Sequence, residues 1–270
     1  ALFGKNPAHV TVNVGTEQEY FLISEKDYER RQDLIVCGRT LFGAPPCKGQ
    51  ELDEHYFGAI RPTVNSFMKE LDDELWGFAV AAKTKHNEVA PCQHELAPVF
   101  CNVNRAVDEN LLTMEMMKLL ASHHGLVCLQ HEKPFEGING SGKHNNWSFG
   151  TEDENLLDPG DTPEANLQFI VFLTCVIEAV DNYQDLLRMS VASCGNDHRL
   201  GAHEAPPAII SIFLGDELSS IIDALTSGET AAHTLREQLD FGVDVLPNLE
   251  RDTTDRNRTS PFAFTGNKFE

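Results

Sequence analysis

The chain has 270 residues, enough to bury a full hydrophobic core, and 41% of them are hydrophobic. Its formal net charge of −21 excludes nucleic acids and anionic membranes as predicted partners, because both bind through basic patches. Seven cysteines, odd in number and without a C-x-x-C pair, argue against a disulfide framework or a zinc site. They favour a reducing compartment, and we therefore expect a cytoplasmic protein.

The sequence predicts neither a signal peptide nor a membrane-spanning segment. The first residues show no signal-peptide pattern, and the apolar run 169–177 is too short to span a bilayer. The chain does not begin with Met and stops within a strand-like segment at Glu270. We expect it to be an excerpt of a longer protein.

The expected elements alternate strands and long helices. Period-two and period-3.6 patterns predict, in chain order, a strand at 11–23, a charged excursion at 27–50, a helix at 62–82, strand and turn at 84–103, a helix at 107–124, strands at 126–130 and 143–149, a helix at 161–190, an apolar stretch at 209–214 and a helix at 217–239. Without regular βαβ alternation, this order predicts an α+β fold.

The first strand carries two carboxylates, Glu17 and Glu19, which share one face because side chains alternate along a strand. Such a pair can serve two neighbouring metal ions, or it can be a solvated strand face. Its flanks, Val14-Gly15 and Tyr20-Phe21-Leu22-Ile23, are largely apolar, and unpaired carboxylates are costly in such a setting. The flanks favour the metal interpretation.

A second pair, Glu88 and Glu95, brackets the sequence Val-Ala-Pro-Cys-Gln-His. Pro91 forces a bend, so the two carboxylates can return to one centre. His86 and His94 lie beside them, and each is either a further ligand or a hydrogen-bonded structural histidine.

The string Asn139-Gly140-Ser141-Gly142-Lys143-His144-Asn145-Asn146-Trp147-Ser148 places an imidazole and short polar side chains after a flexible glycine loop. It is not a P-loop, because Lys-His follows the glycines where Lys-Ser or Lys-Thr would be needed. Together with the four carboxylates, His144 makes a ligand set suited to two hard divalent cations. Two such cations can bind a polyphosphate substrate.

Two further segments carry arginines. Asn196-Asp197-His198-Arg199 precedes Glu204-Ala205-Pro206, and Asp255-Arg256-Asn257-Arg258 precedes Asn267-Lys268-Phe269-Glu270. An arginine fork binds a carboxylate or a phosphate at two points, so both segments are candidates for substrate binding.

Taken together, these segments resemble the catalytic domain of glutamine synthetase, and most closely its type III branch, from about Val12 to the last residue. The resemblance implies a curved antiparallel sheet (a partial barrel) with flanking helices. It further implies that 1–270 is a partial catalytic domain, without the N-terminal β-grasp domain and the C-terminal part, and with a type III helical insertion at about 211–251.

The resemblance also implies residue roles. The first metal would bind Glu19, Glu88 and Glu95, and the second Glu17, His144 and Glu270. Glutamate would contact Asn139, Gly140 and Arg199, and the nucleotide Asn146, Ser148 and Lys268. The residues taken as catalytic are the flap residue Glu204, the phosphoryl-stabilising Arg258 and the metal ligand Glu88.

The implied activity is ATP-dependent ligation of ammonia to glutamate through γ-glutamyl phosphate, with Mg²⁺ or Mn²⁺, in a dodecamer of stacked hexameric rings whose active sites lie between subunits. Two alternatives stay open: a γ-glutamyl-amine ligase, and a non-catalytic structural relative. The sequence departs from common family forms where Thr-Ser-Pro-Phe-Ala-Phe follows Arg258, which leaves one phosphate-side arginine without a counterpart. We expect residues 1–270 alone to be inactive.

Overall fold

The computed structural model describes residues 3–192, 209–228, 238–239, 249–250 and 262–270. Contacts divide the chain into two compact units. The larger unit comprises Asn13–Asn146 and Arg188–Ile209, and the second unit comprises Ala1–Val12, Trp147–Leu187 and Ile210–Glu270. The flap residue Glu204 and the arginines Arg199 and Arg258 lie outside the described residues.

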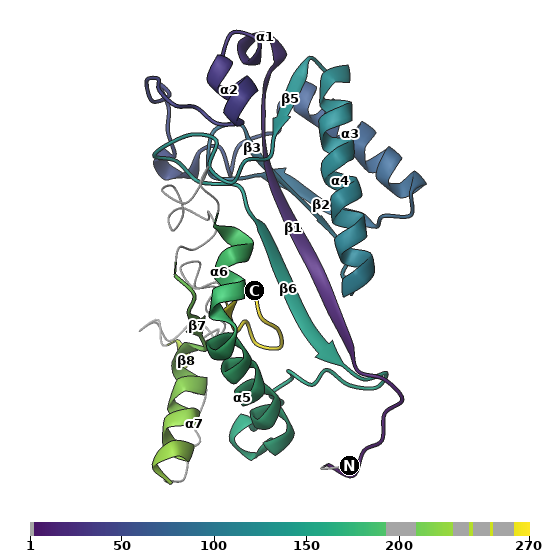
Figure 1. Cartoon of the computed structure of the whole chain (residues 1–270), viewed down its shortest axis with the longest axis vertical. Coiled ribbons are helices and arrows are strands. Elements are labelled where there is room, and N and C mark those ends of the chain that lie inside the picture. Colours follow the sequence, from purple (N-terminus) through teal and green to yellow (C-terminus); the bar gives the residue numbers. More distant parts are fainter. Residues whose placement is uncertain (1–2, 193–208, 229–237, 240–248, 251–261) are drawn as a thin grey trace. The chain divides into compact units, whose positions relative to one another are not determined.

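The larger unit is built on one open antiparallel sheet with helices, as the α+β prediction requires (Figure 1). The sheet does not close into a barrel within the described strands. Its elements are β1 (Thr11–Ser24), α1 (Glu25–Tyr28), α2 (Gln32–Cys37), the 3-10 turn η1 (Glu51–Asp53), α3 (Pro62–Gly77), β2 (Ala82–Asn87), β3 (Gln93–Pro98), β4 (Cys101–Asn102), α4 (Val103–His123), β5 (Leu126–Leu129) and the first half of β6 (Lys143–Gly150).

Strand β1 is the centre of this sheet, because β3, β4, β5 and β6 all pair with it. Strand β2 then pairs with β3 in an antiparallel hairpin. The prediction of a strand at 11–23 is confirmed, and so is the bend at Pro91 that separates β2 from β3. The charged excursion predicted at 27–50 contains helix α2 and part of α1.

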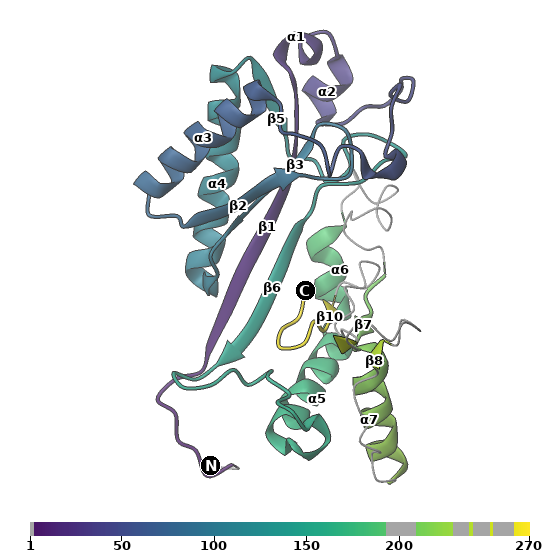
Figure 2. The same ribbon diagram turned by 180° about the vertical axis from the view of Figure 1, so that it is seen from behind.

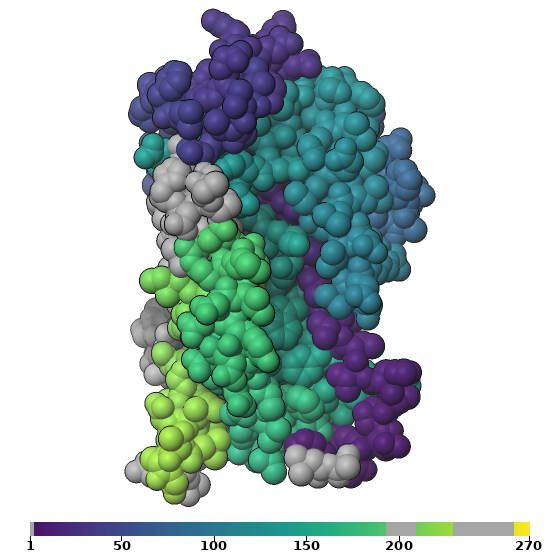
Figure 3. Space-filling view, viewed as in Figure 1, coloured from purple at the N-terminus to yellow at the C-terminus, as the bar shows by residue number. Residues whose placement is uncertain are grey.

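The main core of the larger unit lies between the sheet and helices α3 and α4, which cover one side of it (Figure 2). Tyr20 and Leu22 point to this side from β1, and Leu96 joins them from β3. The outer side of α4 is open on the surface (Figure 3). Helix α4 ends where the sequence predicts, because Gly125 at φ 65° takes the left-handed conformation that stops a helix.

The second unit is mainly helical. Its elements are the end of β6, the 3-10 turn η2 (Pro163–Ala165), α5 (Leu167–Asn182), the start of α6 (Gln184–Val191), β7 (Ile212–Phe213), α7 (Gly215–Ser227), β8 (Gln238–Leu239), β9 (Leu249–Glu250) and β10 (Phe262–Ala263). Aromatic side chains fill its core, where Trp147 stacks on Phe269 and Phe264 meets Phe169.

Two predicted helices of this unit are wrong in extent. The helix expected at 161–190 begins only at Leu167, because Asn166 caps it through a bond from the Phe169 N–H, and it is interrupted at Tyr183. The helix expected at 217–239 ends at Ser227, because Gly228 adopts φ 73°. No helix among the described residues is long and apolar enough to cross a membrane. The six cysteines in the described part of the chain are free thiols.

Adjacent leucines on α4 test this packing. Leu120 is 5% exposed and belongs to the core beneath α4, whereas Leu119 is 54% exposed. We expect Leu120→Ala to lower the free energy of unfolding by about 2–5 kcal/mol, because it leaves a cavity, and Leu119→Ala to cost less than about 1 kcal/mol. Urea denaturation of the full-length protein measures both. Equal losses for the two variants would contradict the orientation of α4.

Candidate metal centre

The strand register places three ionisable side chains in one row across the sheet. Glu19 of β1 lies opposite Glu95 of β3, and Glu95 lies opposite His86 of β2. Residues directly opposite each other in paired strands point to the same face, so this row faces away from the core beneath α3 and α4. The alternation of β1 also places Glu17 on that face.

Glu88 joins this row from the end of the β2–β3 hairpin. Its backbone N–H donates to the Gln93 carbonyl at 2.9 Å, which closes the turn around Pro91. Ligand atoms of His86, Glu88 and Glu95 all lie within 4.8 Å of one another. The Nε2 atom of His86 is 3.3 Å from Glu88 Oε1 and 3.8 Å from Glu95 Oε1. The bend inferred from Pro91 therefore does return both carboxylates to one centre.

Glu19 is the most deeply buried acid of the row, with 1% of its surface exposed. Its Oε2 accepts a hydrogen bond from the Gly142 N–H at 2.8 Å, while its Oε1 is buried and has no hydrogen-bond partner. Burial raises the pKa of Glu19 to about 8, with Glu88 and Glu95 adding to the rise and His144 and the Gly142 N–H opposing it. Burial therefore disfavours the charged form of the Glu19 carboxyl group, which a bound cation would favour.

A divalent cation fits this observation. Glu88 and Glu95 converge, and Glu19, which has a buried oxygen without a partner, lies opposite Glu95 on the same face. Hard cations prefer such oxygen ligands. His86 completes the set with a borderline ligand, and its Nδ1 is also buried without a partner. The sequence left His86 open as a ligand, and the structure places it beside Glu88 and Glu95.

His94, the other open histidine, has a structural environment instead. It is 3% exposed, its Nδ1 pairs with Asn87 Oδ1 at 3.0 Å, and its ring packs against Tyr20 and His55. Burial lowers its pKa to about 3, so the ring stays neutral at physiological pH.

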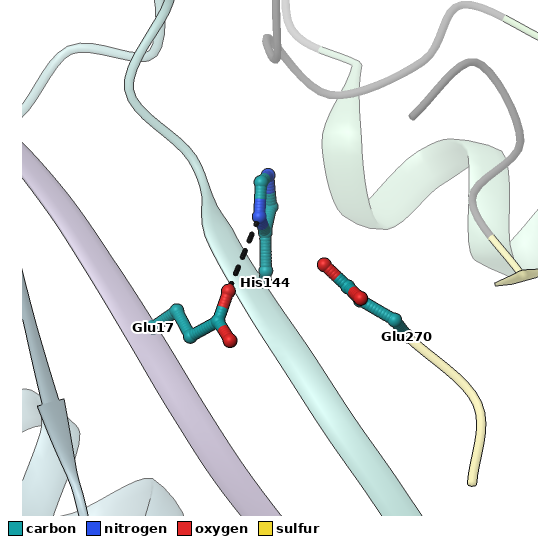
Figure 4. Close-up of side chains that lie close together, drawn as sticks. All are labelled: Glu17, His144 and Glu270. Atoms are coloured by element: carbon teal, nitrogen blue, oxygen red, sulfur yellow. Dashed lines mark ion pairs between the residues drawn. The ribbon is translucent and has the colours of Figure 1, made fainter. Parts of the chain in front are cut away.

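A second group lies further along β1. Glu17 Oε2 is 3.5 Å from His144 Nδ1, and the two residues come from the adjacent strands β1 and β6 (Figure 4). Asn146 Nδ2 donates to Glu17 Oε1 at 2.8 Å, so the predicted nucleotide contact Asn146 lies beside a predicted metal ligand. Glu17 and His144 are both partly exposed, unlike Glu19.

The remaining predicted residues of the described chain fall into two groups. Asn139 and Gly140 lie in the larger unit, and Asn139 is buried. Ser148, Lys268 and Glu270 belong to the second unit. There Glu270 exchanges two backbone hydrogen bonds with Ala263, and the Lys268 carbonyl accepts from Thr265.

Comparisons with known proteins relate this chain to one family. The glutamine synthetase catalytic domain matches residues 5–211. A glutamine synthetase from Butyrivibrio fibrisolvens is 59% identical over 262 residues, covering 97% of this chain and 37% of that protein. A type-3 glutamine synthetase from Dictyostelium discoideum is 53% identical over 271 residues, again with 37% of its length covered.

A cryo-EM structure of glutamine synthetase from Plasmodium falciparum has a TM-score of 0.44 at 21% identity, covering 56% of this chain and 32% of that one. The family match over residues 5–211 establishes membership: this chain belongs to the glutamine synthetase catalytic-domain family. It spans 37% of the length of those two relatives.

Replacing Glu19 tests whether its buried carboxylate destabilises the protein when no metal is bound. Glu19→Gln keeps the size of the side chain and an acceptor for Gly142, but it removes a buried charge beside Glu88 and Glu95. At about pH 9, above the raised pKa, we expect this variant to melt about 2–6 °C higher than the wild type without divalent metal. With Mn²⁺ the order should reverse, because the variant loses a ligand.

Differential scanning calorimetry of the full-length protein with EDTA and with Mn²⁺ measures both melting temperatures. A variant that is less stable than the wild type in EDTA would contradict the account of Glu19 as an uncompensated buried charge. Glu115→Gln, on the exposed side of α4, is the matched control and should change neither value.

Proposed function

We propose that this chain is the catalytic part of a full-length enzyme that ligates ammonia to glutamate, with ATP converted to ADP and phosphate. The observation that carries the proposal is the row of buried carboxylates Glu19, Glu95 and Glu88, with one carboxylate oxygen left unpaired. Family membership supplies the reaction for which such a centre is suited. Nitrogen assimilation into glutamine is the corresponding role, and we place it in the cytoplasm.

The proposed metal sites use both groups of ligands. Glu19, Glu88 and Glu95 would hold a first Mg²⁺ or Mn²⁺, and Glu17, His144 and Glu270 a second. Bound divalent cations neutralise polyphosphate charge and orient the γ-phosphate for attack. The role of the protein residues is to hold the carboxylates on one face, which the antiparallel register of β1 and β3 supports.

The reaction itself requires residues at both ends of glutamate. We propose that Asn139, the Gly140 backbone and Arg199 bind the amino-acid end, so that the γ-carboxylate can attack the γ-phosphate of ATP in line. Arg258 would stabilise the charge on the phosphoryl group during transfer. Glu204 would close over the acyl phosphate and exclude water until ammonia attacks. Asn146, Ser148 and Lys268 are the proposed contacts to the nucleotide.

We further propose that the full-length protein is a dodecamer of two stacked hexameric rings. We also propose that residues 1–270 form a partial catalytic domain with a helical insertion at about 211–251. Head-to-tail contacts close into rings, and each active site would then combine residues of two subunits.

Turnover by the full-length protein tests the proposed activity. We expect glutamine and phosphate in equal amounts from glutamate, ATP, Mg²⁺ and ammonium, and a lower kcat/KM with methylamine, ethylamine or putrescine. A higher kcat/KM with an amine would identify a γ-glutamyl-amine ligase instead. Absence of ATP turnover with every nucleophile would favour the non-catalytic relative.

Removing a first-metal ligand should abolish most of this activity. We expect Glu95→Ala to lower kcat by about 100-fold or more, because the change removes a ligand and leaves the polyphosphate undercompensated. The fold should persist, as judged by circular dichroism and ring assembly. Glu115→Ala, which removes an exposed carboxylate on α4, should retain normal turnover. Near-normal turnover by Glu95→Ala at saturating Mg²⁺ would exclude the metal assignment.

The two proposed substrate arginines should differ in kinetic effect. Arg199→Lys should mainly raise the KM for glutamate by about tenfold, because lysine loses the two-point contact with a carboxylate. Arg258→Lys should mainly lower kcat by about 10–1000-fold, because its partner is charge that develops during transfer. Steady-state kinetics with varied glutamate measures both, and exchanged phenotypes would reverse the assignments.

A further inference from the structure

Three glutamine side chains contact the loop 139–142, in which the predicted glutamate-binding residues lie. Gln18 Nε2 donates to the Gly142 carbonyl at 3.3 Å, and Gln93 Nε2 donates to the Gly140 carbonyl at 2.5 Å. Both of these bonds fix backbone positions. Gln50 differs from them, because it contacts the Asn139 side chain itself.

Gln50 contacts Asn139 at two points. Its Nε2 donates to Asn139 Oδ1 at 3.0 Å, and its Oε1 accepts from the Asn139 backbone N–H at 2.6 Å. Asn139 is only 5% exposed, so these bonds form where water competes little. The amide of Gln50 therefore fixes both the backbone and the carboxamide of Asn139.

The local backbone holds Gln50 in this position. The turn η1 follows it directly, and the Asp53 N–H donates to the Gln50 carbonyl at 3.2 Å. Leu52 and Asp53 both have positive φ values, 55° and 52°, which residues with a side chain adopt only under strain. Strain of this kind persists where the surrounding contacts specify the conformation.

The same segment, 50–58, also contacts the candidate metal centre. His55 Nδ1 lies 2.6 Å from the Glu88 carbonyl oxygen, and Asn87 Nδ2 donates to the His55 carbonyl at 3.1 Å. The segment thus links the loop at Asn139 to the strand end that carries Glu88. The contact between Gln50 and Asn139 therefore belongs to the same segment that contacts the backbone beside Glu88.

We propose that Gln50 is a positioning residue that sets the orientation of the Asn139 carboxamide for binding the amino-acid end of the substrate. This inference rests on the proposed function. Because Gln50 donates to Oδ1, the oxygen of Asn139 faces Gln50 and its nitrogen lies on the other side of the group. An amide nitrogen is a donor, as recognition of a substrate carboxylate requires, whereas a reversed carboxamide would present an acceptor.

Two substitutions at Gln50 distinguish its effect on the orientation of the Asn139 carboxamide from its support of the loop backbone. Gln50→Met keeps the length of the side chain but removes both hydrogen bonds. Gln50→Glu keeps the acceptor for the Asn139 N–H, but a carboxylate cannot donate to Oδ1, so the carboxamide reverses to offer its nitrogen. The loop keeps its contacts in the second variant, and only the orientation of Asn139 changes.

The experiment is steady-state kinetics of the full-length enzyme with glutamate and ATP varied in turn. We expect both Gln50 variants to raise the KM for glutamate about tenfold, with kcat and the KM for ATP changed by less than about twofold. Gln50→Glu should melt within about 2 °C of the wild type. Gln130→Met, which removes a bond from Gln130 Nε2 to the Met114 carbonyl outside this loop, is the control and should leave every constant unchanged.

An unchanged KM for glutamate in Gln50→Glu would overturn the positioning role, since it would show that only support of the loop matters. A higher KM for ATP together with a lower kcat and a lower melting temperature would also overturn it. If the wild type neither binds nor turns over glutamate, the proposed function fails and this inference fails with it. Glutamate turnover by the wild type together with normal Gln50 variants would reject the inference alone.

Discussion

The candidate site depends on one constraint, the antiparallel register that pairs β1 with β3 and β3 with β2. This register places Glu19 opposite Glu95, and Glu95 opposite His86, so their side chains meet on one face. A shift of one residue would turn each of them toward the core. Because such a slip would bury charges among apolar side chains, the apolar partners on the other face enforce the arrangement of the acids.

The two faces of β1 therefore have different roles: one packs in the core, and the other carries the candidate metal ligands. Tyr20 and Leu22 pack beneath α3 and α4, and Gln18 accepts a hydrogen bond from Asn110 of α4 on the same side. Glu19, on the opposite face, is buried with a raised pKa and an unpaired oxygen. A buried carboxyl group with an unpaired oxygen is costly unless a ligand offsets it, so the centre without a metal ion is expected to be a point of local instability.

The sequence predicted strongly periodic elements better than element ends or distant contacts. Strand β1 and the bend at Pro91 were predictable from alternation and proline geometry, and Glu88 and Glu95 followed from them. The helix predicted at 161–190 was wrong in extent, because Pro163 begins only a 3-10 turn. No local pattern marks Gln50, since its partner Asn139 lies 89 residues away and a hydrogen bond across that separation leaves no periodic signal.

Anomalous diffraction from a crystal of the full-length protein soaked in Mn²⁺ is the most direct test of the central claim. We expect a strong manganese peak within about 2.0–2.5 Å of carboxylate oxygens from Glu19, Glu88 and Glu95. We also expect this peak to disappear in the Glu19→Ala protein. A wild-type crystal with manganese bound elsewhere and none between these three carboxylates would contradict the central claim.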